Sequence, residues 1–207
     1  MNTNEYTKRD FQDGISNLLH KGGTVNYYPN VLTHNEANRY FDLLLEKIVW
    51  KNDEAIIFGK HIVAKRKVAW YGDSDYMYTY SNTTKQALVW TKELLDLKEI
   101  VEKLTETKKF NSCLLNLYQN GSEGIGWHSD DEKSIEKNST IASLSFGAER
   151  KFSFKHKQTK QTISLVLGHG SLLIMKDATQ TNWLHSLPKS EKVTGLRINL
   201  TFRTMIC

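Results

Sequence analysis

The second half of the chain contains a series of short runs with strand character, and this series restricts the possible fold more than any other feature. Each run is rich in β-branched, aromatic or other apolar residues, and glycine or polar turn residues separate it from the next. The runs cover residues 113–119, 140–146, 152–156, 162–167, 171–175, 182–187 and 196–203. Short strands at such regular spacing predict a β sandwich or jelly roll.

Two amphipathic helices are expected before these strands. Thr33 or Asn35 can cap a helix through Glu36 to Ile48, because the apolar positions recur three and four residues apart. The same spacing predicts a second helix over residues 84–104. Residues 55–81 mix aromatic and basic side chains, which indicates strands and loops. The predicted fold class is therefore α+β, with helices supporting a jelly roll.

Length and composition exclude several classes of protein. The 207 residues are 39% hydrophobic with only two prolines, which is typical of a globular chain and too apolar for disorder. A membrane helix needs about 18 consecutive apolar residues, and no run here approaches that length. The polar N-terminus lacks the apolar segment of a secretory signal. We therefore expect an intracellular protein without membrane association, nuclear in a eukaryote and cytoplasmic in a bacterium.

The chain is expected to form one domain after a short arm. Residues 1–24 are polar and end in Lys21-Gly22-Gly23, which indicates a flexible N-terminal arm. Residues 25–207 would form the single domain, with the helices and an aromatic, basic lobe in residues 25–110 and the jelly-roll core in residues 111–207. The net charge of +5 permits an anionic partner such as nucleic acid.

A candidate metal site is visible in the second half. His128 and Asp130 are two residues apart, so both side chains face the same side of an extended segment. His185 follows in a strand-like segment that a rolled sheet can bring beside this pair. Two imidazoles and one carboxylate are the ligands favoured by non-haem Fe(II) oxygenases, because they leave positions open for a cosubstrate and oxygen. A His-x-Asp pair alone is common by chance, so this interpretation needs further support.

That support comes from the last predicted strand. Four polar residues alternate there with apolar ones and would point the same way: Arg197, Asn199, Thr201 and Arg203. The planar fork of an arginine matches a carboxylate bidentately, as expected if a dicarboxylate lies inside the barrel. A solvent-facing edge strand is the favoured explanation when the strand is taken alone, but not when the candidate metal ligands are counted with it.

His156 and His169 are the alternative ligands. His156 lies between two lysines, and His169 lies in a Gly-His-Gly turn. Neither has an arginine at the right distance on the next strand, whereas Arg197 follows His185. We therefore expect structural roles for both.

Taken in order, these motifs resemble the AlkB-type Fe(II)- and 2-oxoglutarate-dependent nucleic-acid dealkylating dioxygenases, and in particular the subgroup that repairs alkylated double-stranded DNA. The segments that carry the resemblance are Asn116-Leu117-Tyr118, His128 to Glu132, Ile141 to Ala148, Gly168 to Leu173, His185 to Pro188 and Arg197 to Arg203. The resemblance implies a double-stranded β-helix, which is a jelly roll, with an N-terminal nucleotide-recognition lobe.

The resemblance also implies the roles of the site residues. His128, Asp130 and His185 would be the catalytic residues and would bind Fe(II). Arg197 would hold the distal carboxylate of 2-oxoglutarate, and Arg203 would lie near its iron-bound end. Other contacts to this cosubstrate would come from Asn116, Tyr118, Asn199 and Thr201. The reaction would consume O2, hydroxylate the N-alkyl carbon of a base such as 1-methyladenine or 3-methylcytosine, and release aldehyde, succinate and CO2.

The same resemblance implies a set of substrate-binding residues: Phe58, Gly59, Lys60, Tyr78, Tyr80, Asp131 and Glu132. A base in a duplex reaches a buried iron only after it is flipped out of the stack. Phe58 matches the position of an apolar wedge that supports this distortion, although residues 55–58 alone also suit a buried strand. Tyr80 matches a base-stacking position where the family pattern has Phe.

DNA is the expected partner of a monomeric enzyme, with duplex favoured and single strands possible. Two basic runs, residues 60–67 and 150–160, are candidates for contacts to phosphates, although such runs are also typical of a solvated surface. An RNA demethylase or a protein hydroxylase with the same iron chemistry would not need the wedge at Phe58. A metal-binding module that recognises nucleic acid without turnover is the other alternative.

Overall fold

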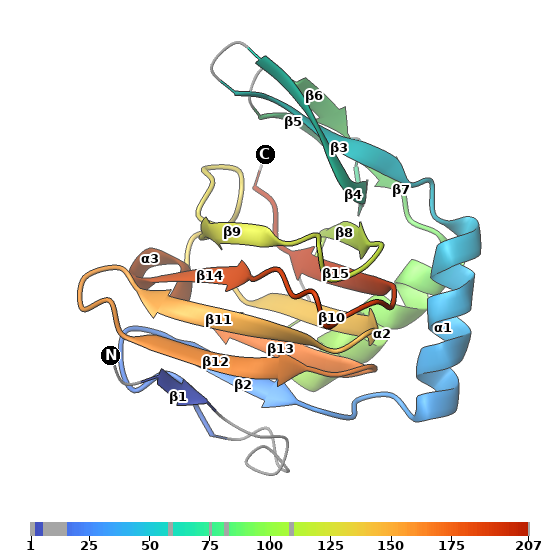
Figure 1. Cartoon of the computed structure of the whole chain (residues 1–207). Coiled ribbons are helices and arrows are strands. Elements are labelled where there is room, and N and C mark those ends of the chain that lie inside the picture. The colour runs from blue at the N-terminus through green and yellow to red at the C-terminus, as the bar shows by residue number, and fades with distance from the viewer. Residues whose placement is uncertain are drawn as a thin grey trace.

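The structure is a computed structural model that describes residues 3–5, 16–57, 60–74, 76–80, 83–107 and 110–206. The side chains of residues 3–5, 55–57, 77–80 and 83–85 lie outside this description. Figure 1 shows two β-sheets packed face to face, with a smaller lobe of strands extending beyond them. The predicted jelly roll is confirmed.

The larger sheet has eight strands and continues into the lobe. Its order is β2 (Thr24–Tyr28), β13 (Ser171–Lys176), β10 (Ile141–Gly147), β15 (Arg197–Arg203), β8 (Ser112–Tyr118), β4 (Lys60–Gly72) and β3 (Lys51–Ile57), and β7 (Leu88–Val89) pairs with β4. Every pair along this path is antiparallel. The long strand β4 therefore connects the jelly roll to the lobe.

The smaller sheet lies opposite and has five strands. Its order is β1 (Thr3–Glu5), β12 (Thr162–Leu167), β11 (Arg150–His156), β14 (Trp183–Leu187) and β9 (Ile125–His128). Each of the runs predicted from residue 113 onward corresponds to a strand in one of the two sheets, with ends that differ by two residues or fewer. The short strand β9, which carries a candidate metal ligand, was not among the predicted runs.

Alternation along the strands fills the space between the sheets with apolar side chains. Phe154, Ile163 and Leu165 from the smaller sheet are at most 1% exposed. They belong to one buried cluster with Leu173 and Met175 from the larger sheet. The candidate site opens within this sandwich, so its polar side chains are surrounded by a rigid apolar frame.

Two helices cover the other face of the larger sheet. Helix α1 (His34–Lys47) begins at the Thr33 cap, whose side chain and Glu36 form a reciprocal capping box. Helix α2 (Lys92–Thr105) begins at the Thr91 cap. Buried residues of both helices share one apolar cluster with residues of β8, β10 and β15. No helix in the described residues is long and apolar enough to cross a membrane.

The prediction of a single helix over residues 84–104 was wrong at its N-terminal end. Thr83–Gln86 forms β6, which pairs with β5 (Met77–Tyr80), and Leu88–Val89 forms β7. Leu88 and Val89 have a spacing that fits a helix, but both are exposed beside β4. The helix begins only where Thr91 supplies an acceptor for a free backbone N–H.

The prediction of a flexible arm over residues 1–24 was also wrong for the part of it that the structure describes from residue 16. Leu18 and Leu19 are 3% and 2% exposed and belong to the core between the sheets. The side-chain oxygen of Asn17 accepts hydrogen bonds from the backbone N–H groups of Leu19 and Val25. Residues 16–24 are therefore anchored to the jelly roll. Residues 6–15 lie outside the described residues.

Two neighbouring leucines on α2 test this packing. Leu94 is fully buried between the helix and the larger sheet, whereas Leu95 is 47% exposed. We expect Leu94→Ala to lower the free energy of unfolding by about 2–5 kcal/mol, because it leaves a cavity in the core. Leu95→Ala should change it by about 0.5 kcal/mol or less. Urea unfolding followed by circular dichroism measures both, and equal losses would contradict the packing described here.

Candidate metal and cosubstrate site

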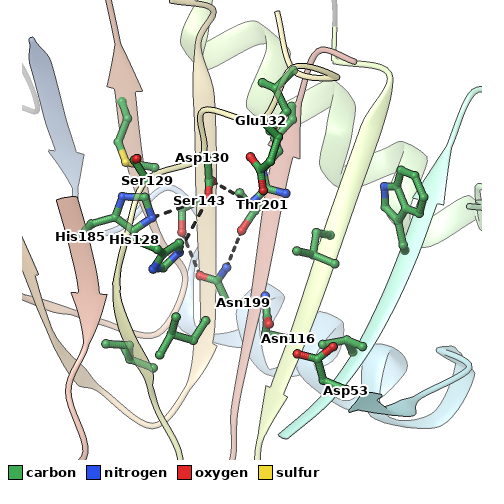
Figure 2. A pocket seen from close by; sticks show the side chains of 18 of the residues that line it. Asp53, Asn116, His128, Ser129, Asp130, Glu132, Ser143, His185, Asn199 and Thr201 are labelled. Atoms are coloured by element: carbon green, nitrogen blue, oxygen red, sulfur yellow. Dashed lines mark hydrogen bonds and ion pairs between the residues drawn. The ribbon is translucent and has the colours of Figure 1, made fainter. Parts of the chain in front are cut away.

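Antiparallel pairing between β9 and β14 brings the two candidate histidine ligands together. His185 lies directly opposite His128 in the register of these strands, and Asp130 follows two residues after His128. One ligand atom from each of the three side chains lies within 4.8 Å of the others. Figure 2 shows the two imidazoles and the Asp130 carboxylate directed toward one another. The structure therefore assembles the predicted triad.

The chemistry of this triad fits a divalent transition metal. His128 Nδ1 lies 2.9 Å from the carbonyl oxygen of Gly126. Because a carbonyl oxygen only accepts, Nδ1 carries the hydrogen and Nε2 keeps its lone pair for a metal. His128 Nε2 and His185 Nε2 lie 3.7 and 3.8 Å from Asp130 Oδ1, which is longer than a hydrogen bond. The three donors therefore leave room for an ion between them.

The electrostatics of the triad favour the protonation states that bind metal. Burial raises the pKa of Asp130, but the nearby charge of Arg203 and the two histidines outweigh burial and lower it to about 2. Arg203 Nη2 donates to Asp130 Oδ2 at 2.7 Å. Burial lowers the pKa of His185 to about 3. At neutral pH the carboxylate is therefore ionised and His185 is neutral, as metal ligands must be.

The triad lies in a pocket of about 500 Å³ between the two sheets and the lobe. The polar residues predicted to contact a cosubstrate all line it: Asn116 and Tyr118 from β8, and Arg197, Asn199, Thr201 and Arg203 from β15. Apolar side chains from the smaller sheet complete the lining, among them Phe152 and Leu187. The pocket thus combines a polar strand with a mostly apolar frame, which is typical of a small-molecule site.

Arg197 is a buried cation that lacks a carboxylate partner among the described residues. It is 2% exposed, and its Nη2 donates at 3.0 Å to both Ser145 Oγ and Asn199 Oδ1, which are neutral acceptors. Its Nε has no hydrogen-bond partner in the part of the chain that the structure describes. Burial lowers the pKa of Arg197 to about 10, so the group stays charged at neutral pH. A pocket with an unbalanced buried cation suits an anionic ligand.

Several residues that line the pocket were not predicted as site residues from the sequence. Ser143 Oγ donates to Asn199 Oδ1 at 2.8 Å, and Asn199 Nδ2 donates to Thr201 Oγ1 at 2.8 Å. Ser143 and Ser145 lie on every second position of β10, so their alternation was a usable signal. Asp53 gave no such signal. Arg66 belongs to the basic run 60–67 that was expected to contact phosphates, but it lines the pocket on the lobe side and forms an ion pair with Asp53.

The predicted substrate residues are only partly brought to this pocket. Asp131 and Glu132 line it, and burial raises the pKa of the Glu132 carboxyl. Lys60 begins β4, is exposed, and is not part of the described pocket lining. Tyr78 and Tyr80 belong to β5, but their side chains lie outside the described residues. Phe58 and Gly59 lie outside the described residues altogether.

The alternative histidines have structural contacts. His156 Nδ1 accepts hydrogen bonds from the backbone N–H groups of Gln158 and Thr159 and so stabilises the turn after β11. His169 Nδ1 accepts from the backbone N–H of Gly147 at 2.8 Å. Neither residue joins the described triad or the pocket lining.

Comparison with protein families now gives the class of the protein. Residues 24–203 match the 2OG-Fe(II) oxygenase superfamily, and the chain belongs to this family. Its donor set, two histidines and one aspartate, agrees with the iron that this family name specifies. The family also specifies 2-oxoglutarate, a dicarboxylate, which suits a pocket that holds Arg197.

The similar proteins include DNA oxidative demethylases and an alkB homolog. The chain is 41% identical over 158 residues to the DNA oxidative demethylase ALKBH2 of Bos taurus, an alignment that covers 72% of this chain and 56% of that protein. It is 39% identical over 187 residues to the alpha-ketoglutarate-dependent dioxygenase alkB homolog 3 of Bos taurus, covering 86% and 64%. With ALKBH2 of Arabidopsis thaliana the identity is 33%, covering 91% and 68%. The alignment therefore spans little more than half the length of ALKBH2 from Bos taurus.

A solved structure supports the fold alone. The structure of OsALKBH1 superposes with a TM-score of 0.61 and covers 90% of this chain and 99% of that one. Sequence identity is only 16%, so this likeness concerns the arrangement of the strands and not the activity.

Proposed function

We propose that this protein is a DNA repair dioxygenase that removes N-alkyl groups, such as methyl, from bases in DNA. One observation carries the proposal: a two-histidine, one-carboxylate triad and the unbalanced buried cation Arg197 lie in the same pocket. A metal site alone would suit many proteins, but a metal site with a second, anion-seeking end suits an oxygenase that uses a dicarboxylate. The names of the ALKBH2 relatives support DNA as the substrate.

In this proposal His128, Asp130 and His185 hold Fe(II), and the pocket beside them holds 2-oxoglutarate. Bound Fe(II), together with 2-oxoglutarate and O2, supplies the oxidising chemistry that hydroxylates the N-alkyl carbon, after which the product releases an aldehyde. Arg203 keeps Asp130 ionised and fixed in place through its 2.7 Å hydrogen bond. The chain's contribution is to position the reactants and to exclude water.

Binding of 2-oxoglutarate follows from the charges along β15. Arg197 would pair with the distal carboxylate, since its own neighbours are neutral acceptors. Asn116, Tyr118 and Thr201 would donate further hydrogen bonds to the cosubstrate. The guanidinium of Arg197 lies over the Tyr118 ring, 5.4 Å from its centroid, and both residues line the pocket.

Recognition of the damaged base would take place between the triad and the lobe. Phe58 would act as the wedge that fills the gap left by a flipped base, with Gly59 and Lys60 close to the DNA backbone. Tyr78 and Tyr80 would stack on the flipped base. Asp131 and Glu132 would contact it from the side of the triad, and their position at the pocket supports this. These roles favour duplex DNA.

The proposed partner is intracellular DNA, bound by a monomer. Exposed or half-exposed lysines lie on two elements, for example Lys60 on β4 and Lys155 on β11. Such side chains suit contacts to phosphates, which position the protein without reading the base sequence.

Aldehyde release tests the proposal directly. We expect formaldehyde from a duplex oligonucleotide that carries 1-methyladenine, in the presence of Fe(II), ascorbate and 2-oxoglutarate. His128→Ala removes one metal ligand, so the rate should fall by about 100-fold or more while circular dichroism stays unchanged. Consumption of 2-oxoglutarate without aldehyde from duplex or single-stranded DNA would indicate an RNA or protein substrate. No consumption at all would indicate a metal-binding module without turnover.

The role of Arg197 predicts a loss of cosubstrate affinity. Arg197→Met keeps an unbranched apolar stem in the core and removes the charge. We expect the Kd of 2-oxoglutarate to rise on the order of 100-fold, because a buried carboxylate loses its paired guanidinium. Calorimetric titration of the protein loaded with Mn(II), which avoids turnover, measures this change. Arg39→Met on the exposed side of α1 is the control, and an unchanged Kd in Arg197→Met would refute the assignment.

The wedge predicts a difference between substrates. Phe58→Ala should lower the rate on duplex DNA by about tenfold, because nothing then fills the gap in the base stack. The rate on the same strand without its complement should stay within about twofold, since no stack has to be opened there. Val89→Ala, a change at an exposed apolar residue of β7, is the matched control. Equal losses on both DNA forms would argue against a wedge.

A further inference from the structure

The third candidate ligand, Asp130, needs support that the sheet does not supply. Strand β9 ends at His128, so the β9–β14 ladder aligns His128 with His185 but does not reach Asp130. Asp130 is only 5% exposed, and a buried backbone N–H needs a partner. This N–H donates to the side-chain oxygen Oε1 of Gln180 at 3.0 Å. A side chain thus takes the place of the missing ladder bond.

Gln180 lies on a one-turn helix that also leads to the second histidine. Helix α3 (Thr179–Asn182) is followed directly by β14, which carries His185. Gln180 is 8% exposed, and its Nε2 donates to Met175 Sδ at 3.3 Å, which turns Oε1 toward Asp130. The same short helix is therefore linked to Asp130 through a side chain and to His185 through the backbone.

Lys157 strengthens this link from the turn after β11. Its Nζ donates to the carbonyl oxygen of Gln180 at 2.9 Å and to Ser129 Oγ at 3.1 Å. Its backbone N–H donates to the carbonyl oxygen of Asn182 at 2.8 Å. Lys157 thereby ties α3 to the residue between His128 and Asp130.

The N-terminal segment also forms hydrogen bonds with α3. Asn182 Nδ2 donates to the carbonyl oxygen of Gly22 at 3.0 Å, and the backbone N–H of Thr24 donates to Thr179 Oγ1 at 3.0 Å. Gly23 has a φ of +151°, and a Cβ there would lie 2.4 Å from Thr179 Oγ1. Only glycine permits this close approach. The Gly22-Gly23 turn, which was expected to be part of a flexible arm, therefore packs against α3.

We propose that Gln180 is a positioning residue that sets Asp130 against His185 in the metal site, with Lys157 and the Gly22-Gly23 turn holding α3 in place. This inference rests on the iron site of the proposed function. Gln180 contacts Asp130 at its backbone N–H and not at its carboxylate, so it fixes the backbone from which the proposed metal ligand projects. Outer contacts of this kind typically change metal affinity by about 10- to 100-fold when they are removed.

The test is a titration of the metal-free protein with Co(II), whose absorption spectrum reports the geometry of its ligands. Gln180→Met keeps the length of the side chain but leaves the buried N–H of Asp130 without an acceptor. We expect its Kd for Co(II) to rise about 10- to 100-fold, with a changed spectrum at saturation. The separate variant Gln180→Glu keeps an acceptor oxygen at the same distance and should retain the wild-type spectrum.

Thr181→Val is the matched control, because Thr181 is the next residue on α3, is exposed, and has Asn138 as its hydrogen-bond partner. It should bind Co(II) as the wild type does. If Gln180→Met does not fold, Lys157→Met tests the same link from a half-buried position, with the exposed Lys151→Met on β11 as its control. We expect Lys157→Met to raise the Kd by about tenfold.

Two kinds of failure are distinguishable. Wild-type affinity and spectrum in Gln180→Met, or an equal loss in Thr181→Val, would overturn the role of Gln180 and leave the iron site intact. Failure of the wild type to bind Co(II) more tightly than His128→Ala would overturn the iron site itself, and the positioning role with it.

Discussion

The metal site depends on the register between β9 and β14. This pairing places His128 opposite His185, although the two residues are far apart in the chain. A slip of one residue would turn one imidazole to the other face of the sheet, because side chains alternate along a strand. Leu187 of β14 belongs to a buried apolar cluster, and Ile125 of β9, its partner across the ladder, packs against that cluster, so apolar packing favours this register. The site therefore inherits its geometry from the packing of the sandwich.

The two arginines of β15 have different partners, so the two ends of the pocket differ in charge. Arg203 pairs with Asp130 and helps to keep that carboxylate ionised. Arg197, six positions earlier on the same face, is surrounded by neutral oxygens of Ser145 and Asn199. The end at the triad therefore suits a cation, and the end at Arg197 suits an anion. A dicarboxylate that also chelates a metal satisfies both requirements, which is the physical basis of the proposed cosubstrate site.

The surroundings of the triad link its protein ligands to distant parts of the chain. The lobe contributes Asp53 and Arg66 to the pocket wall, so the proposed substrate and cosubstrate sites would share one cavity. The N-terminal turn at Gly23 contacts α3, and α3 contacts Asp130 through Gln180. Through these contacts, a segment outside the sheets would influence the geometry of the proposed metal site inside them.

The sequence by itself determined the strand series of the jelly roll, helix α1 with its Thr33 cap, and the candidate triad, because alternation, capping and His-x-Asp spacing are local patterns. It misplaced the start of α2, since Leu88 and Val89 fit a helical period but lie in a strand. It also missed the anchoring of residues 16–24, the place of Ser143 in the pocket lining, and the hydrogen bond from the backbone N–H of Asp130 to Gln180. These depend on which distant strands become neighbours and in what register. Only the tertiary structure decides that, because burial and hydrogen-bond partners across a sheet are set by packing and not by the order of residues.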